Sequence, residues 1–222
     1  MPKVTALMPL YNGKKFIRES LESIQRQTFA DWEFIIVNDF GSDDGCADIV
    51  RRYAQKDDRI ILLQMEERLG IAGSLNAGLD AAKGVYVARV DVDDPSEPER
   101  FEKQVAYMDA HPEVSLCSSF CISVSKTGTH LEKVACDPEE LKAAMLFPNE
   151  IRHFGAMLRR SYFDGHALRY DTEYIVEDYE LWTRALMGGA VFSNIPEVLV
   201  THRWGFGNIS IAKGSRLEEE AR

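Results

Sequence analysis

The first ninety residues alternate between two patterns of hydrophobic and polar positions. Short runs of apolar, β-prone residues predict strands at 4–10, 33–37, 60–64 and 85–90, and apolar residues at helical spacing predict helices at 14–27, 44–55 and 72–82. The strands start 25 to 29 residues apart, which suits one strand followed by one crossover helix. Such βαβ units predict a mostly parallel sheet with helices on both faces.

After residue 94 the alternation becomes less regular. Pro95 and Pro98 predict a turn. The elements expected beyond the turn are helices at 99–110, 138–146 and 176–187 and strands at 114–124, 154–158 and 198–202. Because no linker rich in Gly, Ser or Pro divides the chain, we predict one α/β domain over residues 1–212 and a polar tail at 213–222.

The composition fits a globular protein and narrows its ligands. Of the 222 residues, 45% are hydrophobic and 28% are charged, which excludes a disordered or coiled-coil chain. The 36 acidic residues outnumber the 26 Lys and Arg residues, giving a formal charge of −10. That balance argues against non-specific binding to nucleic acid or anionic lipid. A polyanionic ligand would need a few placed cations or a bound metal.

The cysteines and the apolar runs predict a reducing, aqueous environment. Cys46, Cys117, Cys121 and Cys136 form no CxxC pair and have no histidine at zinc-site spacing, so ordinary reduced thiols are expected. No secretory signal pattern is visible, and the apolar runs fall far short of the roughly 18 residues that a membrane span needs. The sequence therefore predicts a soluble, cytoplasmic protein.

Polar residues follow three of the predicted strands, at 9–13, 38–44 and 91–94. In a parallel α/β sheet, ligands bind beyond the carboxyl ends of the strands, so these residues are expected at one binding edge. Gly13 alone stands where a dinucleotide-binding GxGxxG would be required, and no Gly-Lys-Ser/Thr of a P-loop follows any strand. A nucleotide ligand would therefore need another way to hold its phosphates.

The run Asp91-Val92-Asp93-Asp94 offers such a device. Adjacent carboxylates repel one another unless a cation lies between them, and Mg²⁺ or Mn²⁺ accepts one or two carboxylates together with substrate phosphates. The alternative is that Asp93 and Asp94 only cap the turn before Pro95.

A second acidic pair, Glu177-Asp178, opens the predicted helix at 176–187. Acids at a helix N-terminus complement the helix dipole without any further function. A carboxylate held there against a cleft is also suited to act as a general base that removes a proton from an acceptor hydroxyl.

Five motifs, in this order and spacing, resemble glycosyltransferase family 2: Pro9-x-Tyr-Asn12, Val37-Asn-Asp39, Leu69-Gly70 with Asn76-x-Gly78, Asp91-Val-Asp-Asp94, and Glu177-Asp-x-x-Leu-Trp182. The resemblance spans roughly residues 4–203. It implies an inverting enzyme with a single Rossmann-like GT-A domain, in which 1–94 binds the nucleotide sugar and 95–212 forms the acceptor and catalytic half.

The resemblance implies a donor-binding set made of Pro9, Tyr11, Asp39, Arg68, Asp91, Val92 and Asp93. Pro9 and Tyr11 would line the base of a UDP-sugar, Asp39 would accept a hydrogen bond from uracil, and Arg68 would lie near the base. Asp91 would approach the ribose or the metal. Two departures from the family pattern bear on this set: Phe40 replaces a glycine after Asn-Asp, and Leu75 replaces an arginine before Asn-x-Gly.

The resemblance also implies the metal and acceptor residues. Asp93 and His202 would hold Mn²⁺ or Mg²⁺ at the diphosphate, and Asp178 would be the catalytic base. His153, Glu177 and Trp204 are candidates for the acceptor side; for His153, packing in the interior is the competing interpretation.

The expected function is metal-dependent, inverting transfer of a hexose from a UDP-sugar to a saccharide or lipid-linked acceptor, in cell-surface polysaccharide or glycolipid synthesis. The expected location is the cytoplasm, including the inner face of the membrane. One alternative is a non-catalytic protein that binds nucleotide sugars. The other is a nucleotidyltransferase that makes them, although residues 11–14 are a poor version of its Gly- and Lys-rich loop.

Overall fold

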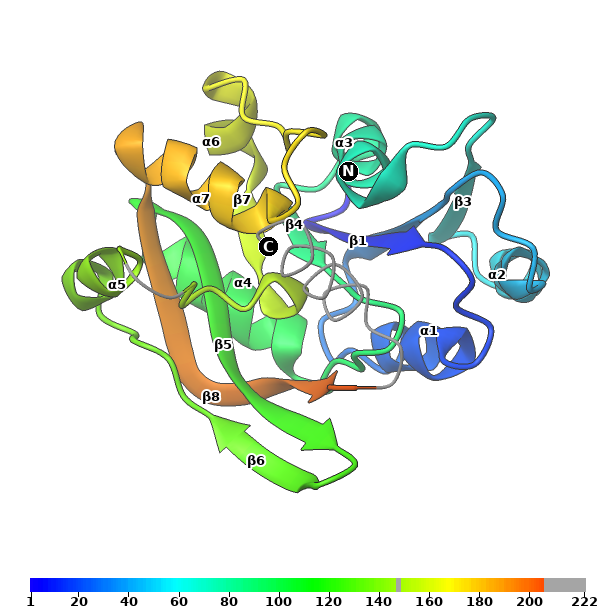
Figure 1. The fold of residues 1–222 in the computed structure, drawn as a ribbon, viewed down its shortest axis with the longest axis horizontal. Coiled ribbons are helices and arrows are strands. Elements are labelled where there is room, and N and C mark those ends of the chain that lie inside the picture. The colour runs from blue at the N-terminus through cyan, green and yellow to red at the C-terminus, as the bar shows by residue number, and fades with distance from the viewer. Residues whose placement is uncertain (147–148, 206–222) are drawn as a thin grey trace, which may run out of the picture.

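The computed structural model describes residues 1–146 and 149–205 (Figure 1). The predicted tail at 213–222 and positions 206–212 of the predicted domain lie outside the described residues. In the first half the elements are β1 (Val4–Leu10), α1 (Ile17–Gln25), β2 (Trp32–Asn38), α2 (Cys46–Ala54), β3 (Ile60–Gln64), α3 (Gly70–Ala81) and β4 (Tyr86–Arg89). In the second half they are α4 (Arg100–Ala110), β5 (Val114–Ser125), β6 (Gly128–Glu132), α5 (Pro138–Ala144), the 3-10 turn η1 (His153–Gly155), β7 (Met157–Arg159), α6 (Arg160–Gly165), α7 (Glu177–Met187) and β8 (Val191–Arg203).

Within the described residues the strands form one sheet in the order β3-β2-β1-β4-β7-β5-β6, with β8 beside β5. Strands β1 to β4 run parallel to one another, whereas β7 is antiparallel to both β4 and β5. The chain passes from β3 through α3 to β4, on the other side of β1. The order therefore reverses at β1 and β4, and this is where open α/β sheets bind ligands.

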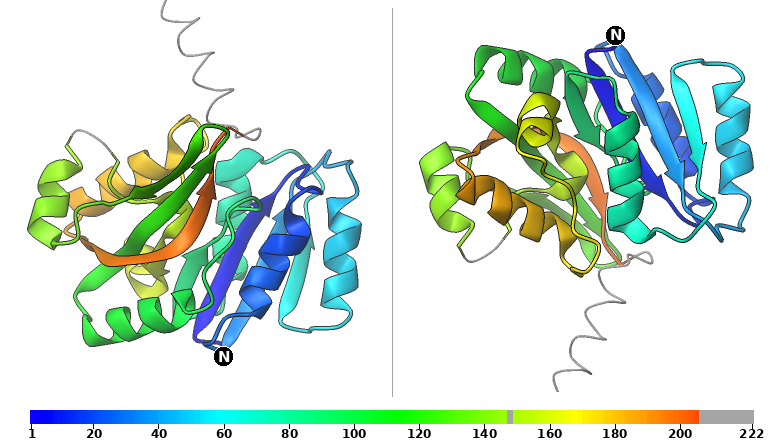
Figure 2. Two further views of the ribbon diagram at one scale, coloured as in Figure 1. Left: turned by 90° about the horizontal axis from the view of Figure 1, so that it is seen from below. Right: turned by 90° about the horizontal axis from the view of Figure 1, so that it is seen from above.

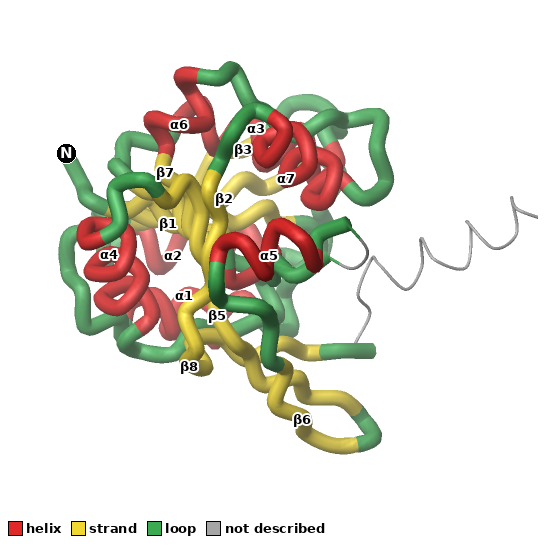
Figure 3. Tube along the Cα trace, turned by 90° about the vertical axis from the view of Figure 1, so that its left-hand side faces the viewer, coloured by secondary structure: helices red, strands yellow, loops and turns green. Residues whose placement is uncertain are grey.

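Helices cover both faces of the sheet, as the sequence predicts (Figures 2 and 3). Side chains alternate along β1: Ala6 and Met8 pack into a core layer with α1, α2 and α4, whereas Leu7 packs into the opposite layer with α3, α6 and α7. Two hydrophobic layers thus hold the sheet between them. None of the described helices has the length and apolar character needed to cross a membrane.

The second half differs from prediction in four places. The predicted strand at 154–158 is the turn η1 followed by the short strand β7, and β8 begins at Val191 rather than at 198. Asn194 and Pro196 interrupt its apolar pattern, and its pairing with β5 contains register shifts. Strand β6 and helix α6 were not predicted; β6 is largely exposed, in a hairpin that projects from the sheet (Figure 1), so no apolar periodicity marks it.

The close approach of β1 and β4 at the reversal point depends on Gly84. A Cβ at this position would lie 2.4 Å from the Thr5 amide nitrogen and 2.7 Å from the Tyr86 carbonyl oxygen. We expect Gly84→Ala to lower the free energy of unfolding by about 1–3 kcal/mol, because backbone must shift to admit the methyl group. Gly165→Ala is the control, since nothing lies within 4 Å of its added Cβ. Equal urea midpoints for the two variants would contradict this account.

Candidate active site

A cleft of about 620 Å³ lies beyond the carboxyl ends of β1, β2 and β4. Its walls contain every residue that the sequence singled out for the donor, metal and acceptor: Pro9, Tyr11, Asp39, Arg68, Asp91, Val92, Asp93, His153, Glu177, Asp178, His202 and Trp204. The first half contributes the loops after its strands, and the second half contributes the start of α7, the η1 region and the end of β8. Residues far apart in the sequence thus line one hollow.

Asp39, directly after β2, is buried and organises the start of α3. Its carboxylate accepts the amide of Phe40 at 3.0 Å, of Leu69 at 2.8 Å and of Gly70 at 3.0 Å, and it forms an ion pair with Arg68 Nε at 2.9 Å. A carboxylate has about four lone-pair directions, so these donors engage its full capacity. The structure therefore gives Asp39 a part in fixing the loop, and the uracil contact expected from the sequence would have to replace one of these donors.

Arg68 also covers the aromatic face that is predicted to line the nucleotide base. Its guanidinium carbon lies 3.6 Å from the centre of the Tyr11 ring, which is a close cation–π contact. A base that stacks directly on this face of Tyr11 must displace Arg68. A base that stacks on the outer side of the guanidinium leaves the pair intact.

The aspartates after β4 have separate partners. Asp91 pairs with the buried Arg89 at 2.6 Å. Asp94 accepts the Arg203 amide at 2.8 Å and bonds to Nδ1 of His202 at 2.7 Å, so its carboxylate fastens β8 to the motif rather than capping the turn that follows. Burial raises the pKa of Asp94 despite the His202 bond. For His202, burial lowers the pKa, but the hydrogen bond and the charge of Asp94 raise it by more, so the net shift of the His202 pKa is upward.

Asp93 is the member of this group that fits a cation. Burial, reinforced by repulsion from Asp94 and Asp91, raises its pKa to about 6, and no described side chain donates a hydrogen bond to it. Nδ1 of His202 is hydrogen-bonded to Asp94, so Nε2 is the ring nitrogen that could bind a metal. A carboxylate that is hydrogen-bonded to a metal-binding histidine in this way commonly orients the imidazole ring.

A preformed cluster of three or more His, Cys, Asp or Glu side chains suited to a metal is absent from residues 1–146 and 149–205. Mg²⁺ and Mn²⁺ are often held by one or two protein oxygens plus phosphates and water, so a site that is completed by the donor diphosphate is consistent with this finding. Asp93 and His202 therefore fit as the protein ligands of a divalent ion whose other ligands are phosphate oxygens and water.

Asp178 lies in the first turn of α7, where its carboxylate accepts a hydrogen bond from Asn149 Nδ2 at 2.9 Å. Burial raises the pKa of Asp178, although the Asn149 bond and the charge of Arg89 oppose the shift. A carboxylate of raised basicity that lines a cleft has the properties of a general base. Its neighbour Glu177 is buried.

His153 is both packed and in the cleft. Its Nε2 is 2.9 Å from the Tyr170 hydroxyl, and its ring meets the edge of Trp182. Burial and the charge of Arg89 put its pKa well below the ordinary value, so the imidazole is neutral near pH 7. Trp204, 49% exposed, lies at the rim with its ring 5.9 Å from that of His202.

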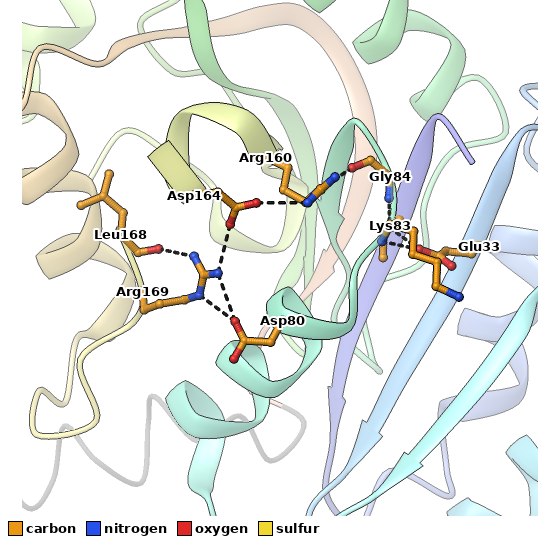
Figure 4. A network of polar contacts seen from close by, with 9 residues as sticks. Glu33, Asp80, Lys83, Gly84, Arg160, Asp164, Leu168 and Arg169 are labelled. Carbon is orange, nitrogen blue, oxygen red and sulfur yellow. Dashed lines mark hydrogen bonds and ion pairs between the residues drawn. The ribbon is translucent and has the colours of Figure 1, made fainter. Parts of the chain in front are cut away.

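The loop between α6 and α7, which leads to Asp178, is held at several points. Asn76 of α3 donates to the Tyr170 carbonyl at 2.8 Å and accepts its amide at 2.9 Å. Arg169 pairs with Asp80 and with Asp164, each at 3.0 Å (Figure 4). The loop is therefore bound to α3 and α6 before it reaches the site.

Arg89, Asn149 and Arg152 are among the cleft residues that were not predicted. Arg89 had a signal, because a charged residue within the apolar run Val-Tyr-Val-Ala-Arg-Val must have a buried partner. Asn149 and Arg152 lie in an irregular segment in which the sequence carries no periodic pattern, so nothing marked them.

The role of Asp39 in the loop gives a stability prediction. Asp39→Ala leaves the Leu69 and Gly70 amides without their acceptor and should lower the free energy of unfolding by about 1–3 kcal/mol. Asp43→Ala, an exposed carboxylate nearby, should change it by no more than about 0.5 kcal/mol. Urea unfolding of both variants provides the measurement. A stability loss in the Asp43 variant as large as that in the Asp39 variant would contradict the assignment.

Known proteins resemble this chain in sequence. The family model described as "Glycosyl transferase family 2" matches residues 5–166. An uncharacterized glycosyltransferase of Methanocaldococcus jannaschii is 32% identical over 91% of this chain and 71% of its own length. The amylovoran biosynthesis glycosyltransferase AmsE of Erwinia amylovora is 30% identical over 95% of this chain and 79% of its own length.

Solved structures share the fold. S. aureus TarS 1-349 in complex with UDP superimposes with a TM-score of 0.77 at 21% identity, covering 90% of this chain and 60% of that one. The mannosyltransferase PcManGT of Pyrobaculum calidifontis, in complex with GDP-Man and Mn²⁺, gives 0.75 at 22% identity, covering 97% and 61%. The chain thus spans about 60% of the length of these structures.

Proposed function

The chain belongs to glycosyl transferase family 2, and from that premise we propose that its cleft transfers a hexose from a UDP-sugar to an acceptor hydroxyl with inversion. The observation that carries the proposal is the presence, in one cleft, of the acidic motif after β4 and the half-buried carboxylate of Asp178 at the start of α7. The acidic motif is suited to hold a cation at a diphosphate leaving group, and the Asp178 carboxylate is suited to accept the proton of an attacking hydroxyl.

On the donor side, the proposal assigns the base to the hollow beside Tyr11 and Arg68, with Pro9 and Asp39 behind it. Asp91, oriented by Arg89, would meet the ribose or the metal, and Val92 lines the wall between the acids. Asp93 and His202 would hold Mn²⁺ or Mg²⁺. When bound, the ion supplies positive charge against the negative charge that develops on departing UDP.

On the acceptor side, Asp178 would take the proton of the hydroxyl as its oxygen attacks the anomeric carbon. One base opposite one leaving group gives in-line displacement, so the configuration at that carbon inverts. His153, neutral near pH 7, would bond to an acceptor hydroxyl without adding charge, and Glu177 would line the same side.

The acceptor is proposed to be a saccharide or a lipid-linked saccharide. Ile175, Val176 and Trp204, exposed by 42%, 52% and 49%, give this end of the cleft an apolar rim that suits sugar faces and lipid chains. A role in cell-surface polysaccharide or glycolipid synthesis, in the cytoplasm or at the inner membrane face, is consistent with the named activity of AmsE.

The base assignment predicts a selective loss. Asp178→Asn should lower kcat for transfer, or for hydrolysis of the UDP-sugar by water, by at least about 10²-fold, because the amide that replaces the carboxylate cannot accept the proton. The Kd for UDP, measured by calorimetry, should stay within about twofold. Glu180→Gln is the control: its carboxylate, in the same turn of α7, pairs with Arg184. Full activity of Asp178→Asn would overturn the assignment; binding without turnover in wild type would favour a non-catalytic binding protein.

The donor and metal assignments predict a coupled stabilisation. UDP with Mn²⁺ should raise Tm, with about 2.7 kcal/mol of added stability when free UDP is 100 times Kd. GDP and dTDP should give smaller shifts, and EDTA should abolish the metal-dependent part. Asp93→Asn should lose that part as well, whereas Asp58→Asn, at an exposed site outside the cleft, should keep it. If the rise in Tm with UDP and Mn²⁺ were unaffected by EDTA and by Asp93→Asn, the metal assignment would be wrong.

A further inference from the structure

We propose that Asn149 is a positioning residue that holds the Asp178 carboxylate in one orientation and in its charged form. This inference rests on the proposed function, in which Asp178 is the base. Asn149 Nδ2 lies 2.9 Å from Asp178 Oδ2, although the two residues are 29 positions apart. The contact joins the irregular segment before η1 to the first turn of α7.

The orientation of the Asn149 amide is determined by a second bond. Its Oδ1 accepts the backbone amide of Ile151 at 3.1 Å, so the oxygen is engaged on the segment itself. A flipped amide would turn Nδ2 toward the Ile151 N–H and its oxygen toward a carboxylate, and both contacts would become repulsive. The donor therefore faces Asp178.

The segment that carries Asn149 is anchored in the protein interior. Ile151 is 1% exposed and belongs to the hydrophobic layer that includes α7. Glu150 accepts the Ala135 amide at 3.2 Å, and Asn194 of β8 donates to the Glu150 carbonyl, also at 3.2 Å. Asn149 is thus presented to Asp178 by a fixed backbone.

The groups that face Asp178 explain why a neutral donor suits this place. Arg89 contributes positive charge, whereas Glu177 adds negative charge beside it, and Tyr170 and the neutral His153 remain uncharged near pH 7. Burial favours the protonated acid, which cannot act as a base. The Asn149 bond stabilises the carboxylate without the large loss of basicity that a second adjacent cation would cause.

The test is Asn149→Leu, which removes the donor but keeps the number and branching of the non-hydrogen side-chain atoms. We expect the pKa of Asp178, followed by the ¹³Cγ shift in an NMR titration of the whole protein, to rise by about one to two units. Because the active form is deprotonated, the acidic limb of kcat/KM for UDP-sugar hydrolysis should move to higher pH by the same amount. The KM for the donor should not change.

Glu150→Ala is the matched control, since it removes a hydrogen bond of the same segment that does not involve Asp178. In this variant the pKa of Asp178 and the pH profile of kcat/KM should be those of wild type. Asn149→Ala replaces Asn149→Leu if the latter does not fold. An unchanged Asp178 pKa, or an equal shift in Glu150→Ala, overturns the inference. A raised pKa with an unmoved acidic limb supports the Asn149 contact but overturns Asp178 as the base, so the two failures are distinguishable.

Discussion

The cleft depends on keeping several buried or half-buried carboxylates close together at one edge of the sheet. Like charges in a poorly hydrated site repel one another, so each must be balanced locally. The balancing pairs are Asp39 with Arg68, Asp91 with Arg89, Asp94 with His202, and Asp178 with Asn149. Asp93 lacks such a donor among the described side chains, and its pKa is raised to about 6. The arrangement therefore leaves one position at which a cation relieves the repulsion.

One of these pairs, Asp94 with His202, also joins the two halves of the domain. His202 and Arg203 come from β8, more than one hundred residues after the motif that they bind through Asp94. Asn76 of α3 holds Tyr170, and Tyr170 in turn contacts His153. These hydrogen bonds at the cleft therefore join the two halves, in addition to the pairing of β4 with β7 in the sheet.

The sequence predicted the first half well because its strands are buried on both faces and its helices are amphipathic, so periodicity reports structure directly. It failed where burial is partial, as in the exposed strand β6, or where polar residues interrupt a strand, as at Asn194 and Pro196 in β8. For the site, strand ends and the family resemblance located the acids. The partners of those acids, such as Asn149, depend on tertiary contacts that have no local pattern.

The hollow beside Tyr11 illustrates the same limit. Leu75, at the position of the family arginine, is fully buried in α3 and faces the core, and Phe40 is 53% exposed in the loop after β2. Arg68 is thus the cation beside Tyr11, and it is already bound to that ring and to Asp39. Under the proposed function, a base that enters this hollow would either displace Arg68 from the Tyr11 ring or stack on the outer face of its guanidinium, so the residues that meet the base depend on a tertiary contact that has no pattern in the sequence.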